Sequence, residues 1–213
     1  MNTLEELWTD SDEKARKLFN EYGIFLTNSF ISERWAERLA VEARRSPYKI
    51  RNDAVGSLGE RGRYWVIPGP RVREIWPDVE MEYRIMRSYA QAVLPEKEVI
   101  LSPYEMSDIN FKIYNKRDSQ GLHYDSQPVS ALLFLTEGAP LEIQLMTGEW
   151  VEVLPYPCLI AIFNGREMKH RVPEGDVERV TMPFNLYFED DQYRPDWIDE
   201  AIYNNKDYVN AES

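Results

Sequence analysis

Histidine and cysteine are scarce in this chain of 213 residues, which contains two histidines and one cysteine. Because Cys158 has no second cysteine to pair with, an internal disulfide is excluded and we expect a reducing setting. Glycine and proline are also few, with 10 and 13 residues, against 43% hydrophobic and 29% charged residues. This composition excludes collagen-like and low-complexity chains, and the length favours one compact domain.

Positive charge and long apolar runs are scarce as well. Lysine and arginine number 25 against 37 acidic residues, so the net charge is −12. A chain this acidic repels phosphate backbones, so we expect no nucleic-acid partner. The longest apolar runs, such as 131–135, are far too short to span a bilayer, and no signal-like segment opens the sequence. We therefore expect no membrane partner and a cytoplasmic location, while nothing indicates the oligomeric state.

The first half of the chain is dominated by helical periodicity. Apolar residues at helical spacing predict helices over 11–22, from 32 to about 47, and over about 78–94, with a short strand at 24–26. Between 49 and 70 four glycines interrupt a stretch without clear periodicity, which indicates a long loop or lid.

From residue 97 onward the hydrophobic pattern has a period of two. It predicts strands over 99–101, 109–114, 129–135, 141–145, 150–153, 158–163 and 179–188. Such a series predicts a mainly β protein with a jelly-roll core and the early helices packed outside it. We expect a single domain over 1–213, with helical support and a lid over 1–96, the jelly roll over 97–190, and a tail over 191–213 that includes a short helix at 195–203.

The two histidines lie where a metal site can form. His123 and Asp125 are two positions apart, and in an extended segment such side chains point to the same side. His170 follows the predicted strand 158–163 and can complete a set of three ligands. Two imidazoles and one carboxylate on one face of an iron ion leave other positions open, as in the facial triad of non-haem iron oxygenases. The alternative is that both histidines are structural, since a single histidine in a strand is more often hydrogen-bonded than metal-bound.

Two predicted strands carry polar side chains on one face and apolar side chains on the other. The polar faces hold Arg179, Thr181 and Asn185 in one strand and Asn110, Lys112 and Tyr114 in the other. A guanidinium beside a hydroxyl inside a barrel is suited to a carboxylate, because its fork donates two parallel hydrogen bonds. The two strands can therefore line one pocket, although an exposed edge strand is the alternative for 179–188.

Taken in order, these motifs resemble the Fe(II)/2-oxoglutarate-dependent dioxygenases of the double-stranded β-helix fold, and most closely their prolyl-hydroxylase-like branch. The likeness is patchy over 24–48 and best over about 107–188. It implies Fe(II), 2-oxoglutarate and O2 as cofactor and cosubstrates. It also implies roles for six residues: His123, Asp125 and His170 would bind iron, Arg179 and Thr181 the distal carboxylate of 2-oxoglutarate, and Tyr114 would lie beside that cosubstrate.

Departures from the family pattern narrow this expectation. Halogenating members replace the carboxylate that Asp125 provides, and nucleic-acid demethylases have a second arginine where this chain has Asn185. The resemblance therefore implies an enzyme that oxidises, by default hydroxylates, an unactivated C–H bond of a small molecule, which we expect to be anionic, and releases succinate and CO2. Desaturation, ring closure and epimerisation begin with the same hydrogen abstraction, and the sequence does not separate them. The alternatives are a metal-dependent jelly-roll oxygenase or isomerase that does not use 2-oxoglutarate, and a non-catalytic jelly-roll binding module.

The stretch 44–74 is basic within an acidic chain, with eight basic residues against three acidic ones. We expect some of its cations to reach the pocket and bind an anionic group of the substrate, with aromatic side chains covering the apolar part. The expected substrate residues are Lys49, Arg51, Arg61, Arg63, Tyr64 and Trp65, together with Asn110, Lys112 and Asn185. The alternative is a solvated loop whose arginines pair with acidic neighbours.

Overall fold

The computed structural model describes residues 4–53, 55 and 57–191. In this part of the chain the helices are α1 (Leu4–Leu7), α2 (Asp12–Tyr22), α3 (Glu33–Arg45), α4 (Gly69–Ile75) and α5 (Val79–Val93). Helices α2, α3 and α5 match the three predicted helices to within two residues, and α4 was not predicted. None of the helices among the described residues is long and apolar enough to cross a membrane.

The helix ends follow from local hydrogen bonding. The side chain of Ser11 accepts from the amide of Lys14 at the start of α2, and Ser32 does the same for Trp35 at the start of α3. Gly23 ends α2 with a φ of 81°, a left-handed conformation that glycine adopts without strain. The chain therefore turns directly from α2 into the first strand.

Twelve strands in the described part form two antiparallel sheets. The large sheet has the order β1 (Ile24–Asn28), β10 (Leu159–Asn164), β7 (Val129–Phe134), β12 (Arg179–Phe188), β5 (Phe111–Tyr114), β3 (Tyr64–Ile67) and β2 (Ile50–Asn52), and β4 (Val99–Leu101) also pairs with β12. The small sheet has the order β6 (Gln120–His123), β11 (His170–Val172), β8 (Leu141–Gln144) and β9 (Trp150–Val153).

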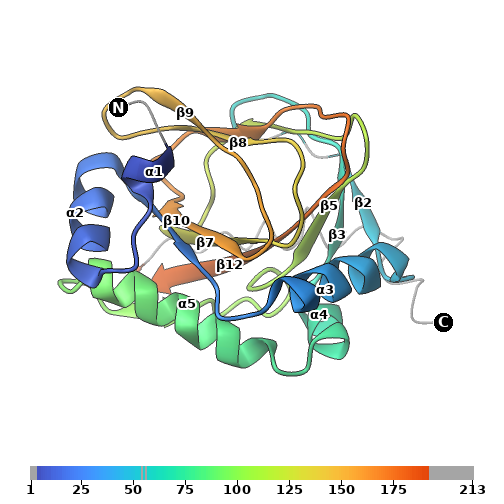
Figure 1. Ribbon diagram of the computed structural model, residues 1–213, viewed down its shortest axis with the longest axis horizontal. Helices are drawn as coiled ribbons and strands as arrows, with labels where there is room; N and C mark the ends of the chain where they lie inside the picture. The colour runs from blue at the N-terminus through green and yellow to red at the C-terminus, as the bar shows by residue number, and fades with distance from the viewer. Residues whose placement is uncertain (1–3, 54, 56, 192–213) are drawn as a thin grey trace.

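The two sheets lie face to face, with helices on the outside of the large one. Figure 1 shows β8 and β9 above β7 and β12, and α5 below them. One hydrophobic core joins the sheets to the helices, and it includes Phe134, Ile162 and Phe184 from the strands and Met86 from α5. The predicted fold class, a jelly roll with helices packed outside, is confirmed.

The expectation of an irregular segment over 49–70 is wrong at its two ends. Strands β2 and β3 pair with each other, with Ile50 opposite Val66, and β3 pairs in turn with β5. Together they extend the large sheet by two strands, so the segment is a wall of the barrel as well as a connection. The helix predicted at 195–203 lies outside the described residues.

Candidate active site

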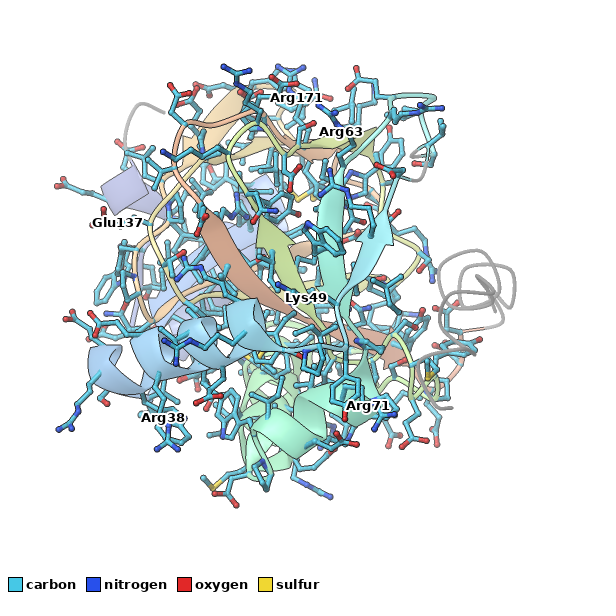
Figure 2. All side chains as sticks on the ribbon, turned by 90° about the vertical axis from the view of Figure 1, so that its right-hand side faces the viewer. Arg38, Lys49, Arg63, Arg71, Glu137 and Arg171 are labelled. Atoms are coloured by element: carbon cyan, nitrogen blue, oxygen red, sulfur yellow. The ribbon has the colours of Figure 1, made fainter. Side chains whose placement is uncertain are left out.

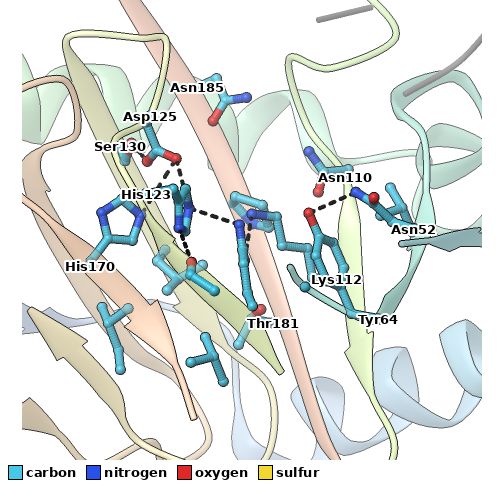
Figure 3. A pocket seen from close by; sticks show the side chains of 18 of the residues that line it. Asn52, Tyr64, Asn110, Lys112, His123, Asp125, Ser130, His170, Thr181 and Asn185 are labelled. Carbon is cyan, nitrogen blue, oxygen red and sulfur yellow. Dashed lines mark hydrogen bonds and ion pairs between the residues drawn. The ribbon is translucent and has the colours of Figure 1, made fainter. Parts of the chain in front are cut away.

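A cavity of about 240 Å³ opens between the two sheets. Its wall in the large sheet comes from inward-facing residues of β5 and β12, and its opposite wall comes from β6 and β11. Figure 3 shows the two histidines and Asp125 on one side, with Asn110, Lys112 and Tyr64 on the other. The predicted alternation of β5 and β12 therefore places their polar faces in one pocket.

The two histidines are brought together by strand pairing. His123 in β6 lies directly opposite His170 in β11, and their ring centroids are 4.1 Å apart. Asp125 follows two residues after His123, and its amide donates to the carbonyl of Gly165 at 2.9 Å. Its Oδ1 lies 3.5 Å from the Nε2 atom of each histidine. One ligand atom from each residue lies within 4.8 Å of the others, which is a suitable arrangement for one metal ion.

Hydrogen bonds set the tautomer of both imidazoles. The Nδ1 atom of His123 lies 2.8 Å from the carbonyl of Gly121, and that of His170 lies 3.0 Å from the carbonyl of Met168. Because a carbonyl oxygen can only accept, each Nδ1 carries a proton, and in the neutral form of each ring Nε2 presents a lone pair. Three lone-pair-bearing atoms therefore converge on one point, an arrangement that a cation would stabilise.

A chain of buried side chains holds Asp125 in place. Ser130 in β7 donates to Oδ2 of Asp125, and Gln127 donates to the Ser130 hydroxyl at 2.7 Å. The turn at Gly165 fits closely around them, since a Cβ there would lie 2.4 Å from the Ser130 hydroxyl. Such supporting hydrogen bonds orient metal ligands.

The ionisation of these groups suits a divalent cation. Burial lowers the pKa of His123, and the neighbouring His170 acts in the same direction. Burial opposes ionisation of Asp125, but the adjacent imidazoles in their protonated form attract the carboxylate and donate to it, which holds its pKa well below the usual value. Neutral imidazoles and an ionised carboxylate are the forms that bind a metal ion.

A buried, unpaired cation lies farther along the cavity. Arg179 is 1% exposed, and its Nη1 donates to the carbonyls of Ala139 at 2.8 Å and Pro140 at 3.1 Å. The Nε atom of Arg179 and the hydroxyl of Thr181 are buried without a hydrogen-bond partner. Burial lowers the pKa of Arg179 to about 10, so the guanidinium is charged at neutral pH. A carboxylate would satisfy both groups.

The loop that approaches Arg179 requires a glycine. Gly138 has a φ of 147°, and a Cβ there would lie 2.6 Å from the Cβ of Arg179. This close approach allows the carbonyls of Ala139 and Pro140 to hold the guanidinium.

Gln120 connects the two ends of the site and was not predicted. Its Oε1 accepts from the hydroxyl of Tyr114 at 2.7 Å and from Nζ of Lys112 at 3.2 Å. Since both partners donate to Oε1, Nε2 faces His123, where it donates to Nε2 at 2.8 Å. Simple alternation would point Gln120 and His123 to opposite faces. An irregularity in the β6–β11 pairing, where Gln120 lies opposite Val172, brings both into the cavity.

The remaining predicted residues divide into two groups. Tyr64, Asn110, Lys112 and Asn185 line the cavity, whereas Lys49, Arg51, Arg61, Arg63 and Trp65 do not. The structure therefore does not place the four predicted cations of the basic stretch 44–74 in the pocket.

Partners outside the cavity explain where these cations lie. Arg51 forms a two-pronged ion pair with Asp118, at 2.8 and 3.0 Å. Lys49 donates to the carbonyl of Arg44, and Arg63 is exposed. Figure 2 shows Lys49 and Arg63 well separated on this side of the molecule. In β3, alternation turns Trp65 away from the cavity while Tyr64 faces it.

Comparison with known proteins adds to this geometry. No protein-family profile matches the chain, and no curated protein matches its sequence. Among solved structures, a prolyl-4-hydroxylase from Pseudomonas putida has a TM-score of 0.60 and 18% identity, over 83% of this chain and 98% of that one. A 2-oxoglutarate-Fe(II) oxygenase family protein from Burkholderia pseudomallei has a TM-score of 0.64 and 13% identity, over 85% and 95%.

A third similar structure was solved with ligands. The epimerase SnoN, in complex with Fe3+, alpha-ketoglutarate and nogalamycin RO, has a TM-score of 0.65 and 12% identity, over 86% of each chain. The fold is that of the 2-oxoglutarate-Fe(II) oxygenases. The match covers most of each oxygenase chain, so the jelly roll and its outer helices belong to the shared oxygenase fold.

Proposed function

We propose that this chain is an Fe(II)- and 2-oxoglutarate-dependent oxygenase that hydroxylates a C–H bond of a small organic molecule. One observation carries the proposal. A single cavity holds three converging metal-ligand atoms and, apart from them, a buried arginine with no carboxylate partner among the described residues. The oxygenase fold supports it.

The triad would hold the iron ion. Both imidazoles present Nε2 toward Asp125, and the protons on Nδ1 are held by backbone carbonyls. Ser130 and Gln127 keep the carboxylate from turning away. Three ligands of this kind would occupy one side of an iron ion and leave positions for a cosubstrate and O2.

Arg179 and Thr181 would hold the distal carboxylate of 2-oxoglutarate. The guanidinium is anchored from behind by two backbone carbonyls, so its remaining N–H groups are free for the ligand. The phenol of Tyr114 lies beside it, with its ring centroid 5.3 Å from the guanidinium carbon. A buried arginine held in this way is pre-organised for a carboxylate.

When bound, iron and 2-oxoglutarate supply, with O2, the oxidising power for a C–H bond, and succinate and CO2 are the co-products. The chain contributes position and exclusion of water. Apolar side chains of Leu132, Leu141, Phe163 and Val172 line the cavity among its polar groups. They keep solvent away from the reacting groups.

The wider setting is also proposed. The chain would work as one domain in the cytoplasm, with a small molecule as its substrate and no nucleic-acid partner. The net charge of −12 supports the last point, and a single buried cysteine is compatible with a reducing compartment.

Succinate formation tests the proposal. The protein is incubated with Fe(II), ascorbate, O2 and 2-oxoglutarate, with and without candidate substrates. We expect succinate from the wild type and none above background from His170→Ala. Metal binding without succinate formation would favour a jelly-roll metalloenzyme that does not use 2-oxoglutarate, and the absence of both would favour a binding module.

A further inference from the structure

A second cation, Lys112, lies in the cavity without an acidic partner. Its Nζ donates to Oε1 of Gln120 at 3.2 Å, and no carboxylate in the described part of the chain lies within ion-pair distance. In the sheet, Lys112 lies directly opposite Thr181, so its ammonium belongs to the wall between the triad and Arg179. This placement differs from that of Arg51, which has Asp118 to neutralise it.

The surroundings of Lys112 disfavour an isolated charge. Burial lowers the pKa of Lys112, and Arg179 acts in the same direction, whereas Asp125 opposes them. Nζ lies 5.6 Å from the ring of Tyr64, a weak attraction compared with an ion pair. A lysine in such a place is costly unless an anion accompanies it.

Two asparagine side chains continue the polar surface along the same wall. Asn110 lies two residues before Lys112 on β5, is 5% exposed, and its Oδ1 has no hydrogen-bond partner. Asn185 from β12 also lines the cavity, and its Nδ2 donates to the carbonyl of Ser107 at 2.6 Å. Figure 3 shows Asn110, Lys112 and Asn185 around the pocket beyond the triad. The wall therefore offers one positive charge and amide groups to a ligand.

The balance of charge points to one further anion. Asp125 is the one carboxylate among the described residues that line the cavity. With the proposed ligands bound, Fe(II) and Arg179 balance Asp125 and the doubly negative 2-oxoglutarate. The charge of Lys112 is then left over.

We propose that Lys112 binds a carboxylate group of a ligand in the cavity, in addition to the carboxylate held by Arg179. This inference rests on the proposed function and makes the substrate a small carboxylic acid. The charge balance favours the substrate, the molecule that the enzyme oxidises, as the source of this carboxylate. The carboxylate of 2-oxoglutarate nearest its keto group is the alternative source.

Binding measurements test this role without turnover. Lys112→Met removes the charge and keeps the aliphatic stem, and Lys116→Met removes the same charge from an exposed position just after β5. In the absence of O2, calorimetry gives the affinity of the Fe(II)-loaded proteins for 2-oxoglutarate. Ligand-observed NMR then compares benzoate with benzamide, two probes of the same shape that differ in charge, both with and without 2-oxoglutarate.

We expect the wild type and Lys116→Met to prefer benzoate, and Lys112→Met to lose at least tenfold in benzoate affinity with benzamide unaffected. If the affinity of Lys112→Met for 2-oxoglutarate stays within threefold of the wild type, the substrate is the source of the carboxylate. A loss of at least tenfold in 2-oxoglutarate affinity also supports the inference, with the cosubstrate as source. If Lys112→Met changes neither affinity, the inference is overturned. A wild type that binds no 2-oxoglutarate contradicts the proposed function, while the benzoate comparison without 2-oxoglutarate still reports on Lys112.

Discussion

Replacing Arg179 by methionine should weaken 2-oxoglutarate binding severely. The guanidinium is 1% exposed and has backbone carbonyls but no carboxylate as partners among the described residues. A bound cosubstrate would complete a buried ion pair. Removing one partner of such a pair costs about 2 to 5 kcal/mol, which is roughly a 30-fold to several-thousandfold loss of affinity.

The stability of the unliganded protein should change little in the same variant. The pKa of Arg179 is lowered by burial from 12.5 to about 10. Because the folded-state pKa of this cation is lowered, its charge costs stability below that pKa, by roughly 3 kcal/mol at neutral pH. Methionine removes this cost but leaves the carbonyls of Ala139 and Pro140 without their donor, at about 1 to 3 kcal/mol each. The two effects oppose each other, so we expect a melting temperature within about 5 °C of the wild type.

Calorimetry and thermal unfolding, both without O2, measure the two effects. At a 2-oxoglutarate concentration 100 times its Kd, the wild type should gain about 2.7 kcal/mol, or roughly 5 to 10 °C in Tm. Arg179→Met should gain about 0.9 kcal/mol at most at that concentration, which corresponds to the smallest expected loss of affinity. Arg63→Met, which removes an exposed arginine outside the cavity, should behave as the wild type. An affinity of Arg179→Met within threefold of the wild type would refute the assignment.

Three further predictions follow from the buried groups. Because burial lowers the pKa of His123, protonation of this ligand should not limit iron binding at or above the ordinary imidazole pKa of about 6.5, and a calorimetric titration that loses binding above that pH would contradict this. Ser130→Ala removes the hydrogen bond to Asp125 and should weaken Fe(II) binding by about 10- to 100-fold. An unchanged affinity would show that Ser130 is not needed to orient the carboxylate. Burial raises the pKa of Glu82, which accepts from Ser29 at 2.6 Å, so its stability contribution is present at low pH and is lost as the pH rises through the folded-state pKa. Glu82→Gln should therefore be more stable than the wild type in urea at pH 7, with the difference shrinking toward pH 4, and a variant less stable at pH 7 would contradict it.

The strands of the sheet core were predictable where polar and apolar residues alternate over enough positions to show a period of two. The strand predicted over 179–188 is observed as Arg179–Phe188, with its polar residues in the cavity. Pro183 lies between the part of β12 that pairs with β5 and the part that pairs with β4, which explains a proline in a central strand. Strands β2 and β3 were missed because three or four residues beside several glycines are too few to show a period.

The sequence alone predicted which residues form the triad, whereas the pairing of strands that are distant in the sequence decided the rest of the site. His123 and His170 could be found because the chain has no other histidine. Gln120 reaches the cavity through an irregularity in strand pairing that no local pattern reveals. Similarly, charge alone could not show that Arg51 pairs with Asp118 outside the cavity while Lys112 lies inside it.

Isotope transfer from O2 to succinate distinguishes 2-oxoglutarate-dependent oxygenation from other reactions at the triad. The protein is incubated with Fe(II), ascorbate and 2-oxoglutarate under 18O2, and the succinate is analysed by mass spectrometry. We expect succinate that carries one 18O atom, formed by the wild type and absent with Asp125→Ala. Succinate without 18O, or equal amounts from the wild type and Asp125→Ala, would contradict it.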